Sequence, residues 1–323
     1  MNYGKKGVRA KQKTLNSKSQ KWGRKLALTC VKVMLAAVVG IGICGVAAGI
    51  GAFRGILSST PTIRLSDVVA VGEATIVYDR EGNEIDQYVS TNSNRLSVGM
   101  DEIPDYMGKA FVAIEDERFY QHNGIDFKGI IRAGYQFLKT GGEEAQGAST
   151  ITQQLLKNTV FTDWTSEGDN KIKKIKRKIQ EQYLALEITK YYSKDEILLR
   201  YMNAINLGQN TLGVESASLR YFGKHCSELT ISECAVIASI TQNPSRYNPI
   251  RHPEENAKRR EKCLNKMLEL GFITQAQYDE AMADTDAVYE RIGLYDIDYQ
   301  EANATTGSYF SDAVYEQVKQ DLI

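Results

Sequence analysis

The chain of 323 residues is 42% hydrophobic with only 5 prolines, which excludes a disordered protein and allows one large domain or two small ones. Its formal net charge is zero, but residues 1–32 contain ten Lys or Arg and no acid, so the remaining 291 residues carry a net charge of −10. Its five cysteines show neither a disulfide framework nor metal-ligand spacing, which favours a role as small apolar residues.

An uncharged stretch follows the basic segment. It runs over residues 33–53, VMLAAVVGIGICGVAAGIGAF, and as a helix it would be about 31 Å long, close to the thickness of a hydrocarbon core. A cleavable signal peptide is the alternative, but its apolar region is usually shorter and lacks so long a basic lead-in. We predict one membrane-spanning helix, with the tail 1–32 in the cytoplasm and the rest of the chain outside. This helix argues against a nucleic-acid partner for the basic segment.

The chain beyond the membrane helix is predicted to be mainly α-helical. Residues 54–73 read as a stalk, and residues 74–89 contain two β-rich runs around Glu81-Gly82-Asn83, which predict a small hairpin. From residue 103 the apolar residues recur at helical spacing, as in Met107, Phe111 and Ile114. Further helical segments follow to about residue 290, and the last residues read as the beginning of another element.

The segment AIEDERFYQHNGID, residues 113–126, places acids directly after an apolar helix. Phe111 and Ile114 are near neighbours of Glu115 on that helix, so its carboxylate is expected at the edge of an apolar surface. Partial burial suits a general acid or base. The alternative is a solvated helix end, which this segment taken alone favours.

The segment GASTITQQ, residues 147–154, begins another helix. Thr150 and Gln153 have the spacing of a capping box, which leaves Ser149 and Gln154 without a structural reason. A helix start rich in hydroxyl groups and free N–H groups can also bind an anion, and Lys157 lies one turn further on.

The helix KIKKIKRKIQEQ is strongly basic and contains one acid in its second half. Arg177 and Lys178 lie four and three residues before Glu181, so this carboxylate is predicted to lie among cations. Such a group suits the binding of a metal ion or the support of charge beside a pyrophosphate. A solvated basic face near anionic lipid headgroups is the alternative.

Five segments in this order resemble the five motifs of the peptidoglycan glycosyltransferase domain of class A penicillin-binding proteins and monofunctional transglycosylases. They are EDERFYQHNG, GASTITQQLLKN, RKIQE, YMNAINLGQNTLGVESASLRYFGK and LTISECAVIASITQNPSRYNP, and the resemblance covers roughly residues 74–285. It implies a mainly α, lysozyme-like fold with a membrane-proximal lobe, and we expect Phe137 and Leu138 either to face lipid in that lobe or to pack in the core.

The resemblance also implies a reaction and its residues. Enzymes of this family polymerise lipid II outside the plasma membrane: a sugar hydroxyl attacks the lipid-linked glycan with inversion, and polyprenyl pyrophosphate leaves. On that model Glu115 is the general base, and Glu181 assists the pyrophosphate directly or through Mg²⁺ or Mn²⁺. The resemblance assigns substrate binding to Asp116, Ser149, Thr150, Gln153, Gln154, Lys157, Arg177 and Lys178. It assigns structural support to Phe119, His122, Gly124, Asn203 and Gly208.

We therefore expect a cytoplasmic tail (1–32), a membrane helix (33–53), a stalk (54–73), a glycosyltransferase domain (74–290) and the start of a linker (291–323). The chain has no Ser-x-x-Lys motif, and its Lys139-Thr140-Gly141 lies inside the transferase region, so no transpeptidase is expected within it. The last residues favour the N-terminal part of a longer bifunctional enzyme over a complete monofunctional one. The cell-wall synthesis machinery is the expected protein partner.

The sequence leaves two other functions open. Two carboxylates could serve a lysozyme-like glycan hydrolase, although a hydrolase needs one of them protonated, and the cations around Glu181 favour its ionised form. A catalytically inactive cell-wall scaffold is the second alternative, and the presence of both glutamates argues against it.

Overall fold

The computed structural model describes residues 4–15, 18–64, 68, 75–78, 80–81, 84–88, 95–140, 147–162, 168, 170–209, 211–293 and 317–318. The chain divides into two compact units, residues 1–60 and 61–323, which we describe separately. Most of the predicted linker and of the last segment lies outside the described residues, as do Gly141 and Gly142.

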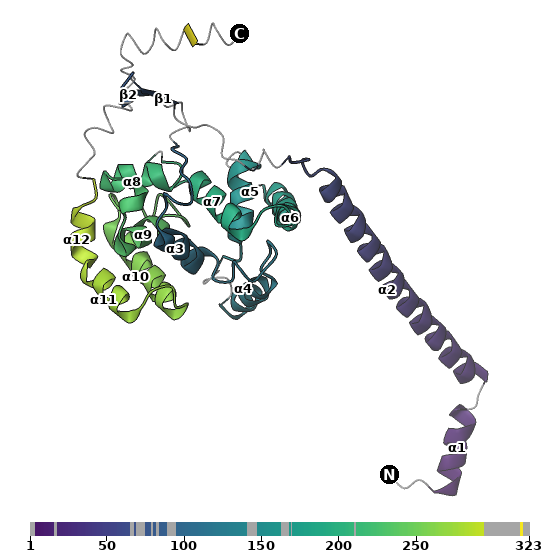
Figure 1. Cartoon of the computed structure of the whole chain (residues 1–323). Helices are drawn as coiled ribbons and strands as arrows, with labels where there is room; N and C mark the ends of the chain where they lie inside the picture. The colour runs from purple at the N-terminus through teal and green to yellow at the C-terminus, as the bar shows by residue number, and fades with distance from the viewer. Residues whose placement is uncertain are drawn as a thin grey trace. The chain divides into compact units, whose positions relative to one another are not determined.

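The first unit consists of helices α1 (Lys5–Leu15) and α2 (Lys18–Ser58) (Figure 1). Within α2, the stretch Trp22–Ser58 is long and apolar enough to cross a membrane, and none of its most apolar window is buried in the protein. An exposed apolar helix of this length is costly in water. It includes the predicted span 33–53, and it supports a single-pass membrane protein.

The second unit is mainly helical, as predicted (Figure 1). Two short strands, β1 (Thr75–Tyr78) and β2 (Glu84–Tyr88), pair antiparallel near its start, with an irregular register between Val77 and Tyr78. The helices that build the unit are α3 (Asp105–Glu115), α4 (Phe127–Thr140), α5 (Ile151–Thr159), α6 (Lys171–Ile188), α7 (Lys194–Ala204), α8 (Val214–Phe222), α9 (Ile231–Ala238), α10 (Pro253–Glu269), α11 (Gln275–Ala283) and α12 (Thr285–Glu290), with the 3₁₀ turn η3 (Cys226–Glu228).

The core lies between two groups of helices that meet at α3. On one side α3 packs against α9 and α10, and on the other α5 packs against α6 and α7, with α7 also touching α3. Met107 and Phe111 are fully buried, as their spacing predicted, and the Phe111 ring meets that of Tyr201 edge to face at 5.5 Å. Aromatic pairs in this geometry add about 0.5–1.5 kcal/mol to the burial of their surface. The C-terminus of α3 is thereby fixed between the two groups.

Helix α4 is different, because only Gly129 along its length is buried. Phe137 is 55% exposed and Leu138 is 82% exposed, so the expectation that they pack in the core is wrong. Ile131 and Tyr135 are exposed as well. Lipid contact by this face stays a prediction.

The fourth motif supports the fold at two positions. Asn203, which is buried, donates to the carbonyl of Val98 at 2.9 Å and accepts from its N–H at 3.2 Å, tying α7 to the segment before α3. Gly208 has a positive φ of 80°, and a β-carbon there would lie 3.2 Å from the Tyr221 hydroxyl. The structural role predicted for these two residues fits their surroundings.

The cysteines of the second unit are buried and unpaired. Cys226, Cys234 and Cys263 are at most 1% exposed, and none forms a disulfide. They behave as small core residues.

Candidate active site

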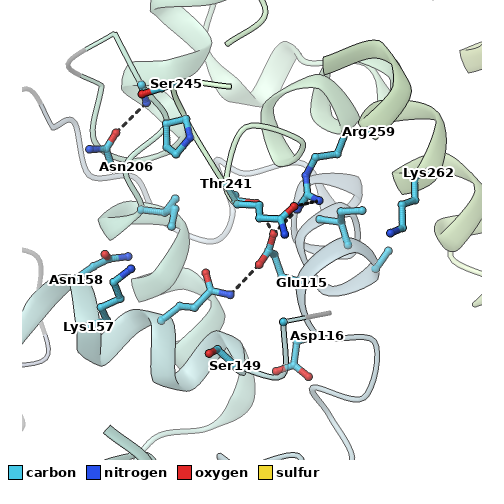
Figure 2. A pocket seen from close by; sticks show the side chains of 18 of the residues that line it. Glu115, Asp116, Ser149, Lys157, Asn158, Asn206, Thr241, Ser245, Arg259 and Lys262 are labelled. Atoms are coloured by element: carbon cyan, nitrogen blue, oxygen red, sulfur yellow. Dashed lines mark hydrogen bonds and ion pairs between the residues drawn. The ribbon is translucent and has the colours of Figure 1, made fainter. Parts of the chain in front are cut away.

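A cavity of about 1220 Å³ opens between the two groups of helices. Figure 2 shows Glu115 in its middle, with Lys157 and Ser149 on one side and Arg259 and Lys262 on the other. Of the predicted site residues, the cavity brings together Glu115, Asp116, Ser149, Gln154, Lys157, Lys178 and Gly208.

The lining is rich in cations. Among the described residues, three acids line the cavity, Glu115, Asp116 and Glu117, against seven bases: Arg132, Lys157, Lys178, Arg251, Arg259, Lys262 and Lys266. A concave surface of this charge attracts anionic ligands and raises their local concentration. The cavity is therefore suited to a substrate that carries phosphate groups.

Glu115 is the last residue of α3, and its side chain is 11% exposed. Its Oε1 accepts from the Thr241 hydroxyl at 2.5 Å and from Nη2 of Arg259 at 2.8 Å, while its Oε2 accepts from Nε2 of Gln154 at 2.8 Å. These donors come from three different parts of the chain, so the carboxylate has one fixed direction. The solvated helix end considered from the sequence is wrong for this residue.

The orientation of the Gln154 amide follows from Tyr201. Burial raises the pKa of the Tyr201 phenol well above its usual value, so this hydroxyl keeps its proton. It donates to Oε1 of Gln154 at 3.3 Å, which leaves the amide N–H₂ of Gln154 for Glu115. The predicted site residue Gln154 therefore has a defined role as a donor to Glu115.

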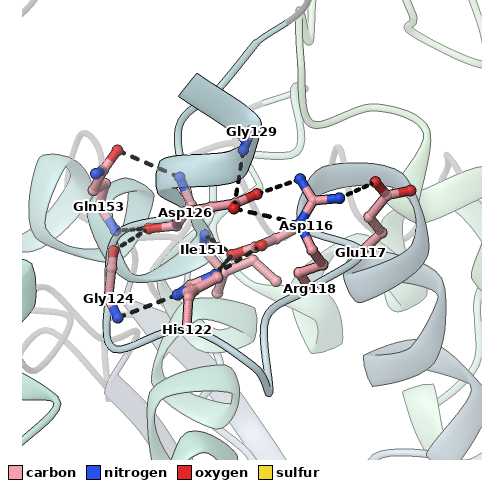
Figure 3. Close-up of polar contacts among 10 residues, drawn as sticks. Asp116, Glu117, Arg118, His122, Gly124, Asp126, Gly129, Ile151 and Gln153 are labelled. Atoms are coloured by element: carbon pink, nitrogen blue, oxygen red, sulfur yellow. Dashed lines mark hydrogen bonds and ion pairs between the residues drawn. The ribbon is translucent and has the colours of Figure 1, made fainter. Parts of the chain in front are cut away.

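The loop after Glu115 is organised around the buried Asp116 (Figure 3). Asp116 accepts from Nε2 of His122 at 2.9 Å and from the backbone N–H of Ile151, at the start of α5, at 3.0 Å. Nδ1 of His122 accepts from the N–H of Gly124 at 3.2 Å, which makes Nε2 the protonated nitrogen. A carboxylate at a helix N-terminus is favourable. Asp116 thus joins the loop to α5.

Phe119 and Gly124, which were also predicted to support this loop, and Thr150, which was predicted to bind substrate, all make contacts within or next to it. Phe119 is fully buried, and its ring meets that of His122 edge to face. The Thr150 hydroxyl donates to the carbonyl of Gly124 at 2.7 Å and caps α5 by accepting from the N–H of Gln153 at 3.2 Å. The predicted capping box of Thr150 and Gln153 is confirmed. Both side chains are buried and neither lines the cavity, so their geometry favours a structural role.

Glu181 is fully buried on α6, and both of its carboxylate oxygens accept hydrogen bonds from basic side chains. Arg177 binds Oε1 and Lys178 binds Oε2 at 2.7 Å, as the spacing predicted. Lys178 also donates to the Ser149 hydroxyl at 3.1 Å and lines the cavity, whereas Arg177 and Glu181 do not line it. Glu181 therefore places the ammonium group of Lys178 at the cavity wall.

The surroundings of Glu181 do not fit a divalent cation. Mg²⁺ and Mn²⁺ need several oxygen ligands, but the oxygens of Glu181 already bind an arginine and a lysine. Among the residues that the structure describes, no group of three or more His, Cys, Asp or Glu could hold a metal ion. The metal site stays a prediction that this geometry does not favour.

Glu117 links α4 to the rest of the site. Its Oε1 accepts from Arg132 of α4 at 2.7 Å, and its Oε2 lies 3.7 Å from Nζ of Lys266 on α10. The hydrogen bond from Arg132 lowers the pKa of Glu117 below its usual 4.5. A depressed folded-state pKa means that this stabilisation is present above pH 4.5 and is lost as the pH falls below it.

We expect Glu117→Gln to loosen α4, because so little of that helix is buried. A partly exposed ion pair contributes about 1 kcal/mol, so amide hydrogen exchange in α4 should become about fivefold faster at pH 7. Wild-type protein should lose the same protection once the pH falls far enough below 4.5 to protonate Glu117, whose pKa is lowered in the folded state. Glu269→Gln is the control, since Glu269 pairs with the same Lys266 but at the surface. Equal exchange in wild type and Glu117→Gln would contradict this role.

The sequence interpretation missed the α10 side of the cavity. Arg259, Lys262 and Lys266 line it, and Thr241 precedes them in the loop after α9. Their spacing of three and four residues along PEENAKRREKCLNKMLE is that of one helix face. A basic face on an otherwise mixed helix was the available signal, but only the fold shows that it meets Glu115.

Comparisons with known proteins place this site in a family. The chain matches the family model described as Transglycosylase over residues 81–268, which is more than half of its length. It is 39% identical over 276 residues to penicillin-binding protein 1A of Clostridium perfringens (strain 13 / Type A), covering 83% of this chain and 39% of that protein. It is 32% identical over 323 residues to penicillin-binding protein 1A/1B of Bacillus subtilis (strain 168), covering 98% of this chain and 34% of that protein.

A solved structure of penicillin-binding protein 1A from Haemophilus influenzae matches 66% of this chain and 20% of that chain, at 23% identity and a TM-score of 0.34. The chain spans two fifths or less of the curated relatives named above. The matched segment contains every residue of the cavity on α3, α5, α6 and α10. The chain belongs to the transglycosylase family.

Proposed function

We propose that the protein is a membrane-anchored peptidoglycan glycosyltransferase that polymerises lipid II into β-1,4-linked glycan strands. The observation that carries the proposal is the carboxylate of Glu115, which three side chains hold in one direction inside a cavity that is lined mainly by basic residues. Membership in the transglycosylase family supports the same reaction class. A base and a cationic surface are sufficient for the displacement of a pyrophosphate.

In this reaction Glu115 takes the proton of the 4-hydroxyl of an incoming GlcNAc. The oxygen forms a bond to the anomeric carbon of the lipid-linked glycan, and the bond from that carbon to the pyrophosphate oxygen breaks. Attack opposite the leaving group gives inversion, and the electron pair leaves with polyprenyl pyrophosphate. The hydrogen bonds from Gln154, Thr241 and Arg259 keep the carboxylate oriented for proton transfer.

The pyrophosphate is assigned to the wall formed by α5 and α6. Lys157 and Lys178 line the cavity there, and Ser149, just before α5, lines it too and accepts a hydrogen bond from Lys178. Lysine ammonium groups neutralise phosphate oxygens as point charges. Glu181 and Arg177 act behind this wall, because Glu181 binds both Arg177 and Lys178.

We expect Lys178→Gln to weaken both binding and leaving-group departure. The loss of one charge-assisted contact costs about 1.5–3 kcal/mol, so kcat/KM for lipid II should fall about 10- to 100-fold. Lys176→Gln is the matched control, since Lys176 is an exposed lysine of the same helix outside the cavity. A similar loss of kcat/KM in both variants would show that the net charge of the helix matters, and not the position of Lys178 at the cavity wall.

The apolar helix α2 supports an anchor in the plasma membrane, and the basic tail supports a cytoplasmic N-terminus with the catalytic unit outside. Lipid II and the growing lipid-linked glycan are then the substrates, and they reach the cavity from the same membrane. The cell-wall synthesis machinery is the proposed protein partner. Labelling of cysteines placed in residues 4–15 and 275–290 in intact cells tests the orientation.

Two substrates given to the detergent-solubilised chain test the reaction class. With labelled lipid II, with and without Mg²⁺ or Mn²⁺, the proposal expects long glycan on a gel. With preformed glycan, it expects no shortening. Shortened glycan without polymer would instead indicate a hydrolase, and neither product from folded protein would indicate a scaffold.

A further inference from the structure

Two adjacent arginines on α10 have different surroundings. Arg260 is fully buried, and it donates to the Ser232 hydroxyl at 2.8 Å, to the Thr285 hydroxyl at 3.0 Å and to the carbonyl of Ala281. These partners lie at α9, α11 and the start of α12, so Arg260 holds helices together. Arg259 points the other way, into the cavity (Figure 2).

The Arg259 guanidinium is held at three points. Its Nη2 donates to Oε1 of Glu115 at 2.8 Å and its Nη1 donates to Oε1 of Gln242 at 2.8 Å, while its face lies 5.1 Å from the centre of the Tyr247 ring. The side chain is 10% exposed, about as little as that of Glu115. A planar cation stacked on an aromatic ring and bonded at both ends loses little entropy when it binds a carboxylate.

The neutral donors to Glu115 cannot replace this contact. The Thr241 hydroxyl has one proton, and the carbonyl of Ala238 at 3.0 Å competes for it with Glu115. Gln154 is neutral and binds the other carboxylate oxygen. A buried carboxylate that must be ionised at the start of each cycle needs a compensating charge close by, and a fixed cation supplies it without rearrangement.

We propose that Arg259 is a positioning residue for the reaction, which holds the Glu115 carboxylate in place and directs it at the acceptor hydroxyl. The inference rests on the proposed function, because it assigns Arg259 to the base of that reaction. Arg259 acts through Glu115 and makes no covalent contribution.

The test compares Arg259→Ala, Arg259→Lys and Lys258→Ala in the full chain, with steady-state kinetics on lipid II. Lys258 is the surface control, since it is exposed and pairs only with Glu255 among the described residues. We expect Arg259→Ala to lower kcat about 30- to 100-fold with KM changed less than about threefold, because the loss concerns the transition state. Arg259→Lys should recover part of the rate, and Lys258→Ala should behave as wild type.

Chemical rescue separates positioning from a structural role. Guanidinium ion added at millimolar concentration should raise the rate of Arg259→Ala about tenfold, by filling the space between Tyr247 and Glu115, and should not affect wild type or Glu115→Gln.

Thermal unfolding shows whether Arg259→Ala is folded. If it is not, kcat and KM of Arg259→Lys are compared with those of wild type instead, and an unchanged kcat in Arg259→Lys overturns the proposal. A raised KM with unchanged kcat in either variant also overturns it, because Arg259 would then bind substrate directly. A lowered kcat without rescue, from folded Arg259→Ala, overturns it as well. No polymer from wild type would overturn the proposed function itself.

Discussion

Glu115→Gln is expected to reduce lipid II polymerisation at least about 1000-fold. Glutamine has nearly the same size as glutamate, but its amide cannot take the acceptor proton, and a positioned general base contributes about 10²- to 10⁴-fold. The side chain also loses the charge that Arg259 pairs with. Rates of single turnovers with labelled lipid II measure the effect on chemistry without product release.

Glu187→Gln is the matched control for this substitution. Glu187 lies on α6 and pairs with Lys190 at the surface, outside the cavity. It should polymerise at the wild-type rate and unfold within about 2 °C of the wild-type temperature, whereas Glu115→Gln should stay folded but lose its ion pair with Arg259. Near-normal polymerisation by Glu115→Gln would remove Glu115 from the role of base.

Gly124→Ala is expected to destabilise the catalytic unit by about 3 kcal/mol. Gly124 has a φ of +90°, and a β-carbon there would lie 2.3 Å from the carbonyl oxygen of Ala185 in α6. The positive φ costs about 1–2 kcal/mol for a non-glycine residue, and the overlap adds about as much again. The melting temperature should fall by roughly 6–12 °C.

Activity should fall further than stability in this variant. The carbonyl of Gly124 accepts from Thr150 at the start of α5, and its N–H donates to His122, which binds Asp116. A shift of Gly124 therefore moves the residue next to Glu115. Gly134→Ala is the control, because a β-carbon at this position of α4 meets nothing within 4 Å and alanine favours a helix. An unchanged melting temperature in Gly124→Ala would show that α6 can move away from the new β-carbon without a loss in the free energy of unfolding.

Much of the fold follows from local patterns in the sequence. The spacing of Met107 and Phe111 predicted the buried face of α3, and the Thr150 and Gln153 spacing predicted the cap of α5, because both depend on residues within one or two turns. The Glu181 ion pairs with Arg177 and Lys178 were predictable for the same reason. The exposure of Phe137 and Leu138 could not be predicted, because the sequence pattern of an amphipathic helix is the same whether its apolar face meets a core or a membrane.

The site was predictable only in part. Glu115, Gln154 and Lys178 come from short motifs, and the cavity brings them together. Arg259 lies 144 residues after Glu115, and no pattern near either residue indicates that they meet. Contacts of this kind depend on how α3, α9 and α10 pack together, which periodicity alone does not determine. Thr150 and Gln153 are the opposite case. The family resemblance suggested that they bind substrate, but their burial favours a structural role.

The glycosyltransferase reaction forms two products from lipid II, glycan polymer and polyprenyl pyrophosphate, and measuring both at once tests it most directly. The chain of 323 residues in detergent would be incubated with doubly labelled lipid II, and polymer and polyprenyl pyrophosphate would be counted over time. A glycosyltransferase releases one polyprenyl pyrophosphate for each glycosidic bond formed, and we expect this ratio together with a polymer that lysozyme digests. Polyprenyl pyrophosphate without polymer, or neither product from folded protein, would contradict this expectation.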